Sequence, residues 1–141
     1  MSLRVLTALG VAVLSACGGG RTLMFSASSL ASAAPADAYA CATDQFKKLG
    51  YKIRAHDEVD YRIAAELDNA EIKDPTGLFR RGFDRLEFTA APDASGKTQV
   101  NIKAQSFKES VTARGNNLDE IEATSQARAA SKTIMEACAP A

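Results

Sequence analysis

The sequence predicts a single two-layer α+β domain, in which a four-stranded antiparallel meander carries the N- and C-terminal helices on one face. Two stretches, residues 37–49 and 118–137, show the three- and four-residue spacing of apolar side chains that is typical of helices. Between them, apolar and polar residues alternate in four shorter stretches that turn-forming residues separate. The predicted order is therefore α-β-β-β-β-α, and short connections favour strands that neighbour one another in sequence order.

The first helix is expected over residues 37–49. Its apolar residues recur at helical spacing, namely Ala38, Cys41, Ala42, Phe46 and Leu49. Asp37 is predicted to be its N-cap, because a short carboxylate can accept a hydrogen bond from a free backbone N–H of the first turn. Gly50 is expected to end the helix, because glycine adopts the left-handed conformation without steric cost.

Two hairpins are expected next. The first pairs residues 51–55 with residues 61–67, around a polar turn at 57–60. Residues 64–69 also have helical propensity, but the alternation that begins earlier favours a strand. Residues 69–84 are expected to be irregular, with a turn at 74–77. The second hairpin then pairs residues 85–90 with a strand from 99 to 105 that is expected to continue through Phe107 towards Val111.

The final helix is expected over residues 118–137, with Asn117 as its cap. Three carboxylates in its first turns, Asp119, Glu120 and Glu122, would complement the positive end of the helix. Its apolar residues repeat every three or four positions, namely Ala123, Ala127, Ala130, Ile134 and Cys138.

The N-terminal residues have the pattern of a targeting signal. Arg4 precedes an apolar run over residues 5–14, which has the length of a signal peptide and falls short of the roughly 20 residues that a membrane-spanning helix needs. Leu14-Ser15-Ala16-Cys17 follows and resembles the lipobox of bacterial lipoproteins. The resemblance implies cleavage before Cys17, lipidation of its thiol and acylation of the new amino terminus. The alternative is an ordinary secretory signal that is cut later, within residues 31–36.

These features divide the chain into three parts. Residues 1–16 are expected to be the signal peptide, and residues 17–36, rich in Gly, Ser and Ala, a lipidated flexible tether. Residues 37–141 are expected to form one periplasmic domain. Gly18 directly follows Cys17, and by resemblance to Gram-negative lipoproteins this implies an outer-membrane protein that faces the periplasm. The alternative is a secreted or soluble periplasmic protein.

Cys41 and Cys138 are expected to form a disulfide, because an oxidising compartment favours pairing of two remaining cysteines. The predicted topology agrees, since four alternating strands make the two helices antiparallel and place the start of the first beside the end of the second. The alternative is two separately buried thiols.

The sequence offers little for catalysis. It contains no nucleophile elbow, phosphate-binding glycine loop or zinc-ligand spacing, so no metal or cofactor is predicted. The acidic turn at 57–60 is expected to be solvated. The only histidine, His56, is expected at an exposed strand end. Glu66 and Glu87 can pair across the sheet, although Arg62 and Arg85 beside them favour cross-strand ion pairs.

Two surfaces are candidates for a partner. The polar sheet face is expected to carry more basic than acidic residues and to bind an anionic glycan, lipid head group or acidic protein. Its basic residues are Lys52, Arg54, Arg62, Arg85 and Lys103. The second surface interleaves apolar residues with arginines on a long loop and comprises Leu78, Phe79, Arg80, Arg81 and Phe83. The alternatives are a solvated sheet face, and a loop whose Leu78 and Phe83 close the edge of the core.

The formal net charge of zero argues against nucleic-acid binding, which needs a dominant positive field. The sequence therefore favours a membrane-tethered, non-catalytic binding or scaffold module of the cell envelope. Its partner is expected to be another envelope protein or an anionic envelope component. The alternative is a small hydrolase-like periplasmic enzyme that uses His56 or the carboxylates of Glu66 and Glu87. Small envelope-assembly lipoproteins include two-layer α+β domains of this size, which is a similarity of fold alone.

Overall fold

The computed structural model describes residues 22–140, so the predicted signal peptide and the predicted lipidation site, Cys17, lie outside the described residues. The elements, in chain order, are β1 (Phe25–Ala31), α1 (Pro35–Lys48), β2 (Lys52–Asp57), β3 (Arg62–Asp68), β4 (Phe79–Pro92), β5 (Thr98–Thr112), β6 (Gly115–Ile121) and α2 (Ser125–Cys138). The α+β class is confirmed. The sheet has six strands, so the prediction of four is wrong.

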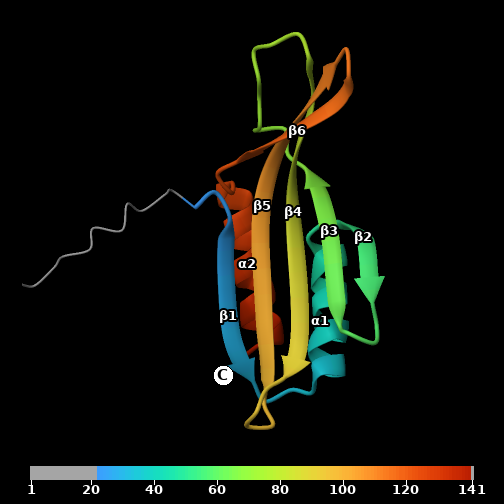
Figure 1. The fold of residues 1–141 in the computed structure, drawn as a ribbon. Helices are drawn as coiled ribbons and strands as arrows, with labels where there is room; N and C mark the ends of the chain where they lie inside the picture. The colour runs from blue at the N-terminus through green and yellow to red at the C-terminus, as the bar shows by residue number, and fades with distance from the viewer. Residues whose placement is uncertain (1–21, 141) are drawn as a thin grey trace, which may run out of the picture.

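The expected meander corresponds to β2–β5, which pair in sequence order and antiparallel. The complete sheet has the order β1-β5-β4-β3-β2, and β6 also pairs with β5. Residues 98–104 of β5 pair with β1, and residues 106–112 of the same strand pair with β6. β1 and β6 therefore lie end to end along one edge of the sheet (Figure 1).

β1 corrects the prediction of a flexible tether over residues 17–36. Its side chains alternate as in any half-buried strand, with Ala31 buried and Ser26 and Ser28 exposed. Serine and alanine differ little in hydrophobicity, so this alternation gave no strand signal in the sequence. The folded part of the chain consequently begins before Asp37.

β6 and α2 correct the prediction of a helix over residues 118–137. Residues 115–121 pair with β5 as a hairpin, and α2 begins only at Ser125. The N-cap is Thr124, whose side-chain oxygen accepts a hydrogen bond from the backbone N–H of Ala127. Asn117, the predicted cap, and the carboxylates of Asp119 and Glu120 lie in the strand instead.

β4 begins at Phe79, six residues before the predicted start of this strand at Arg85. The residues of the second candidate surface from Phe79 to Phe83 therefore belong to the sheet, and the prediction that they form a loop is wrong. Only residues 69–78 connect β3 to β4. This connection folds against the sheet where Ile72 packs on Gly82, because glycine has no Cβ to occupy that space.

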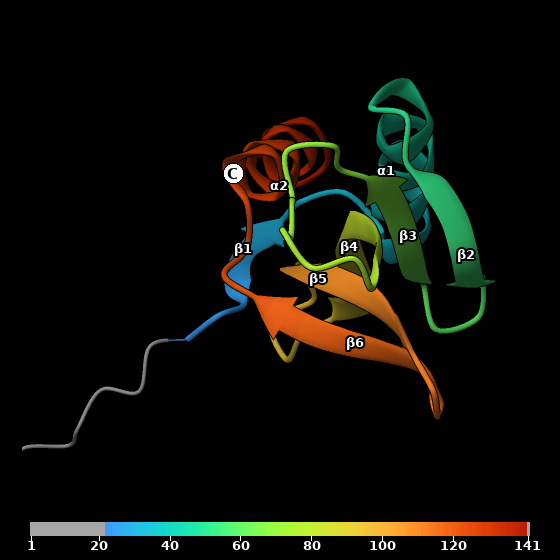
Figure 2. The same cartoon turned by 90° about the horizontal axis from the view of Figure 1, so that it is seen from above.

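Both helices cover the same face of the sheet, as predicted (Figure 2). The core between the layers contains large side chains that are at most 2% exposed, namely Phe46, Ile63, Leu86, Phe88, Val100, Ile102 and Ile134. Burial of each such side chain stabilises the fold by about 1.5–3 kcal/mol. Gly50 follows α1 with a positive φ of 82°, as expected, whereas the N-cap is Ala34 instead of the predicted Asp37.

A disulfide joins Cys41, midway along α1, to Cys138, the last residue of α2. The two Cα atoms are 5.5 Å apart, within the range of about 4.4–6.8 Å that disulfides require. The predicted pairing is therefore confirmed, and with it the antiparallel arrangement of the helices.

Candidate functional site

The face of the sheet opposite α1 and α2, here called the open face, carries the strongest candidate site (Figure 2). Strand register assigns side chains to it, because residues directly opposite one another in an antiparallel pair point to the same face. All five basic residues that the sequence assigned to the first candidate surface are exposed or half-buried and belong to this face, namely Lys52, Arg54, Arg62, Arg85 and Lys103. The predicted placement of this surface is correct.

Each of these basic residues has an acidic neighbour. Glu66 lies opposite Arg85 and Lys52. Lys103 of β5 lies opposite Glu87 of β4. Lys52, Arg54 and Arg85 share the carboxylate of Glu66. Register also places four further carboxylates on this face, namely Asp57, Asp68, Glu109 and Glu120. With Arg81 counted among the cations, the open face is balanced in charge where the sequence predicted a basic surface, because pairing across strands depends on a register that the sequence leaves open.

One end of the open face is a charged cluster, defined by Glu66, Arg81, Arg85 and Glu109 around the rings of Phe83 and Phe107. Arg85 donates to the carboxylate of Glu66 at 2.7 Å, and Arg54 donates to its other oxygen at 3.3 Å. Arg81 donates to Glu109 at 2.8 Å, and this hydrogen bond raises the pKa of Arg81. These pairs confirm the predicted cross-strand ion pairing of Glu66.

The two phenylalanines of this cluster stack across β4 and β5 with ring centroids 5.3 Å apart. The guanidinium of Arg81 lies 4.2 Å from the ring centre of Phe83, and that of Arg85 lies 5.0 Å from the ring centre of Phe107. Phe83 is only 1% exposed although no helix covers it. The arginines thus cover the rings through cation–π contacts, which commits their charge to the fold.

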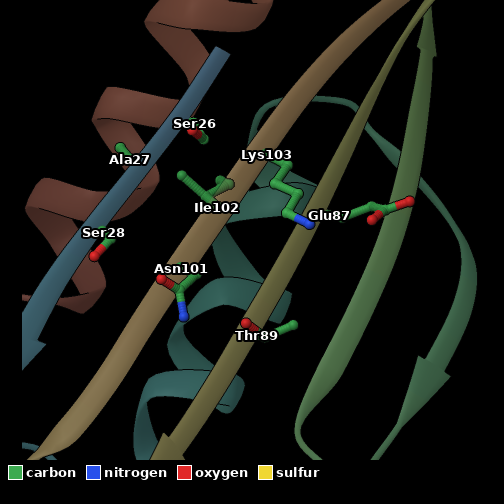
Figure 3. A pocket seen from close by; sticks show the side chains of 8 residues that line it. All are labelled: Ser26, Ala27, Ser28, Glu87, Thr89, Asn101, Ile102 and Lys103. Carbon is green, nitrogen blue, oxygen red and sulfur yellow. The ribbon is translucent and has the colours of Figure 1, made fainter. Parts of the chain in front are cut away.

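The remainder of the open face is hollowed into two adjoining depressions of about 390 and 420 Å³, together called the sheet trough. Glu87, Thr89 and Lys103 line both depressions. Ser26, Ser28 and Asn101 line the first (Figure 3). Small hydroxyl and amide side chains form its floor, and Lys103 extends from β5 towards Glu87 (Figure 3). Such a surface offers hydrogen-bond donors and acceptors to a ligand that lies across the strands.

Two residues that the sequence considered for catalysis border the second depression, but their side chains do not meet there. His56 and Glu87 both line it, from β2 and β4. β3 lies between these strands, which separates their backbones by about 10 Å at ~4.8 Å per strand. His56 lies opposite the core residue Ile63, so its ring belongs to the helix-covered side of the sheet, where the hydroxyl of Tyr39 on α1 lies 3.4 Å from Nδ1. Glu66 and Glu87 do not face one another, because Glu87 lies opposite Ala64.

The acidic turn between β2 and β3 has a structural function. The carboxylate of Asp57 accepts hydrogen bonds from the backbone N–H groups of Asp60 and Val59, which lower the pKa of Asp57. Within residues 22–140, no group of three or more His, Cys, Asp or Glu side chains is arranged to hold a metal ion.

Sequence reasoning missed a polar cluster on the helix-covered face of the sheet. The carboxylate of Asp84, which is fully buried, accepts hydrogen bonds from Ser106, Thr124 and Asn69 at 2.5, 2.9 and 2.9 Å. Burial, and then the charge of Asp84, raises the pKa of Tyr51, whose hydroxyl is buried without a hydrogen-bond partner. The available signal was that Asp84 continues the apolar series of Leu86 and Phe88 on β4.

This cluster joins β4, β5, the connection after β3 and the start of α2. Because Asp84 and Ser106 have no exposed surface, a substrate does not reach them. We therefore assign the cluster to the stability of the fold.

None of the helices within residues 22–140 has the length and apolar character needed to cross a membrane. No model of a known protein family matches this chain, and no curated protein matches it.

Proposed function

We propose that this protein is a lipoprotein of the bacterial outer membrane that faces the periplasm and acts as a non-catalytic binding module. The sheet trough carries the proposal. It is a shallow surface of two adjoining depressions, about 390 and 420 Å³, in which acidic, basic and hydroxyl side chains lie among aliphatic ones, on the sheet face that no helix covers. Its hydrogen-bonding side chains suit the direct hydrogen bonds and polar rim of a protein interface. Its occupant is another envelope protein, with an anionic envelope component as the second candidate.

The lipid anchor supports the location. Leu14-Ser15-Ala16-Cys17 has the pattern of a lipobox, and residues 5–14 form the apolar run that precedes it. Stable anchoring needs more than one acyl chain, and a lipoprotein of this type carries several. Bound in this way, the module would stay at the membrane while its trough engages the partner.

The anchor is tested by labelling cells with an acyl-chain analogue. The wild-type protein is expected to incorporate the label, and Cys17→Ser is expected to incorporate none. Equal labelling of the two proteins would reject the lipoprotein assignment.

The binding surface is tested by chemical crosslinking of intact envelopes, followed by affinity capture of the protein. Thr89→Trp fills the trough between its two depressions and is expected to lose the crosslinked partner. Lys132→Trp places the same side chain on the exposed side of α2 and is the matched control. Equal capture by both variants would reject the trough as the binding surface.

One observation favours a second candidate, a small hydrolase-like periplasmic enzyme. Asp57 and Glu87 line the same depression, and His56 borders it from β2 with its ring towards Tyr39 of α1. In this case the purified protein would hydrolyse members of a panel of chromogenic esters, phosphates and glycosides, and His56→Ala would abolish the activity. An activity that His56→Ala retains would reject this candidate.

A further inference from the structure

The exposed apolar side chains gather at one end of the molecule. Within residues 22–140, five of the seven large hydrophobic residues that are exposed belong to the start of β1, the connection before β4 or the β5–β6 hairpin; they are Leu23, Met24, Leu78, Val111 and Leu118. Figure 1 shows this hairpin and the connection before β4 projecting together beyond the helices. Leu78, Val111 and Leu118, which are 57%, 47% and 47% exposed, are here called the apolar tip.

The three side chains of the apolar tip are neighbours. The backbone N–H of Val111 donates to the carbonyl of Leu78 at 2.8 Å, so these residues lie side by side. Leu118 lies opposite Glu109, two residues from Val111, and therefore shares a sheet face with Val111 as its diagonal neighbour. Single exposed apolar residues are common, whereas a contiguous group on a projection marks a contact surface.

The chain enters the folded body at the same end. The carbonyl of Leu23 accepts a hydrogen bond from the backbone N–H of Ala123 at 2.9 Å, directly after β6. Six residue steps separate Cys17 from Leu23 and span at most about 21 Å at ~3.5 Å per residue. From Ile121, the hairpin extends six residues to Gly115, about 20 Å at ~3.4 Å per residue. The greatest distance from Leu23 to a lipidated Cys17 is therefore about equal to the length of the hairpin, so the anchor can lie beside the apolar tip but not far beyond it.

We propose that the apolar tip docks on the phospholipid surface in which Cys17 is anchored. The inference rests on the proposed lipid anchor and adds an orientation to it. Because the anchor holds the tip within a short distance of the lipid, even a weak apolar contact is occupied most of the time. Arg114, which is exposed in the turn of the hairpin, faces the phosphate head groups, whereas Arg80 lies 3.9 Å from the carboxylate of Glu109.

This orientation sets the position of the sheet trough. Asn101, in the trough, lies ten residues along β5 from Val111, about 34 Å at ~3.4 Å per residue. With the tip on the lipid, β5 directs the trough away from the membrane, towards partners in the periplasm.

The test uses the full-length lipoprotein in vesicles of phosphatidylethanolamine and phosphatidylglycerol. An environment-sensitive fluorescent amino acid replaces Ala113, in the turn of the β5–β6 hairpin, which leaves the apolar tip intact. The control position is Val59, which is 86% exposed in the turn between β2 and β3, at the opposite end of the sheet (Figure 1). The probe at Ala113 is expected to shift to the blue and to be quenched by brominated lipids, and the probe at Val59 is expected to do neither.

Leu118→Asp is then added to the protein that carries the probe at Ala113, and it is expected to return the emission to that of the Val59 control. An acyl label on Cys17 is measured in each preparation. If the protein is acylated and its Ala113 probe nevertheless matches the Val59 probe, docking is overturned and the anchor stands. If the protein carries no acyl group, the anchor is rejected, and the orientation that depends on it is rejected as well.

Discussion

Asp84 shows how a single buried carboxylate can organise segments from four parts of the chain. Its carboxylate accepts three side-chain hydrogen bonds. An amide at this position would replace one accepting oxygen by an NH₂ group, which donates and would face the donors that now bond to Asp84. We predict that Asp84→Asn lowers the free energy of unfolding by about 1–3 kcal/mol. Urea denaturation measures this, with the exposed Glu87→Gln as the control. Equal midpoints for the two variants would contradict the assigned function of Asp84.

Gly82 is the second residue on which the fold depends locally. A Cβ at this position would overlap the side chain of Ile72, whereas nothing lies within 4 Å of a Cβ at Gly77. Gly82→Ala is therefore expected to destabilise the protein by about 1–3 kcal/mol, and Gly77→Ala is expected to have little effect. Thermal unfolding compares them. The nearest atom is the Cβ of Ile72, so Ile72→Gly removes the overlap, and Gly82→Ala should cost less in that background than in the wild type. An unchanged cost would argue against this packing.

Asp93 makes the stability depend on pH. The hydroxyl of Ser95 donates to this exposed carboxylate in the turn between β4 and β5, and the hydrogen bond lowers the pKa of Asp93. The pKa of Asp93 is lower in the folded state than in the unfolded state, where it is about 3.9. This difference stabilises the folded protein at pH values above the unfolded pKa, and the stabilisation disappears as the pH falls through the folded pKa. Asp93→Asn should therefore lose less stability than the wild type on acidification below about pH 4. Identical pH profiles from urea denaturation would reject this linkage.

At the level of elements, the sequence predicted those strands and helices whose large apolar side chains meet in the core. Ile63, Leu86 and Ile102 alternate with polar residues, and Phe46 and Ile134 recur at helical spacing. Period and burial therefore agree in α1, α2 and strands β3–β5, whereas β2 has no buried residue although its sequence alternates.

β1 and β6, which the sequence did not predict, lack this agreement between sequence period and burial. β1 has a serine on its half-buried side and a leucine on its exposed side, Ser29 and Leu30, so its two faces differ little in hydrophobicity. All residues of β6 from Gly115 to Glu120 are exposed, which leaves no apolar period, and its acidic residues suggested the first turns of a helix. The Asp84 cluster was missed for another reason, because its partners come from separate segments that only the tertiary structure brings together.

The disulfide links the two helices, and we predict that it contributes to stability without shaping the fold. It closes a loop with a sequence separation of 97 residues. Replacing both Cys41 and Cys138 by Ala should cost about 2–5 kcal/mol and leave the circular dichroism spectrum unchanged. Mass spectrometry of the unreduced protein, purified from the periplasm, should find both thiols oxidised. Two free thiols in that preparation would contradict the pairing.

The helix-covered face, the sheet trough and the apolar tip lie in different parts of the molecule. The helices and their disulfide close one face of the sheet, the sheet trough occupies the open face, and the apolar tip projects from one end (Figure 1). The sequence predicted the basic residues of the open face and the ion pairing of Glu66, but not the balance of charge over the whole face, because register decides which side chains meet. It also left out the trough, whose hollow depends on small side chains from several strands.

The central claim is that the sheet trough binds a partner in the envelope, and site-specific photo-crosslinking in intact cells tests it most directly. A photoreactive amino acid at Ser28, which is exposed in the trough, is expected to yield one discrete adduct of higher mass. The same amino acid at Lys132, on the exposed side of α2, is expected to yield none. No adduct from Ser28, or the same adduct from both positions, would contradict the claim.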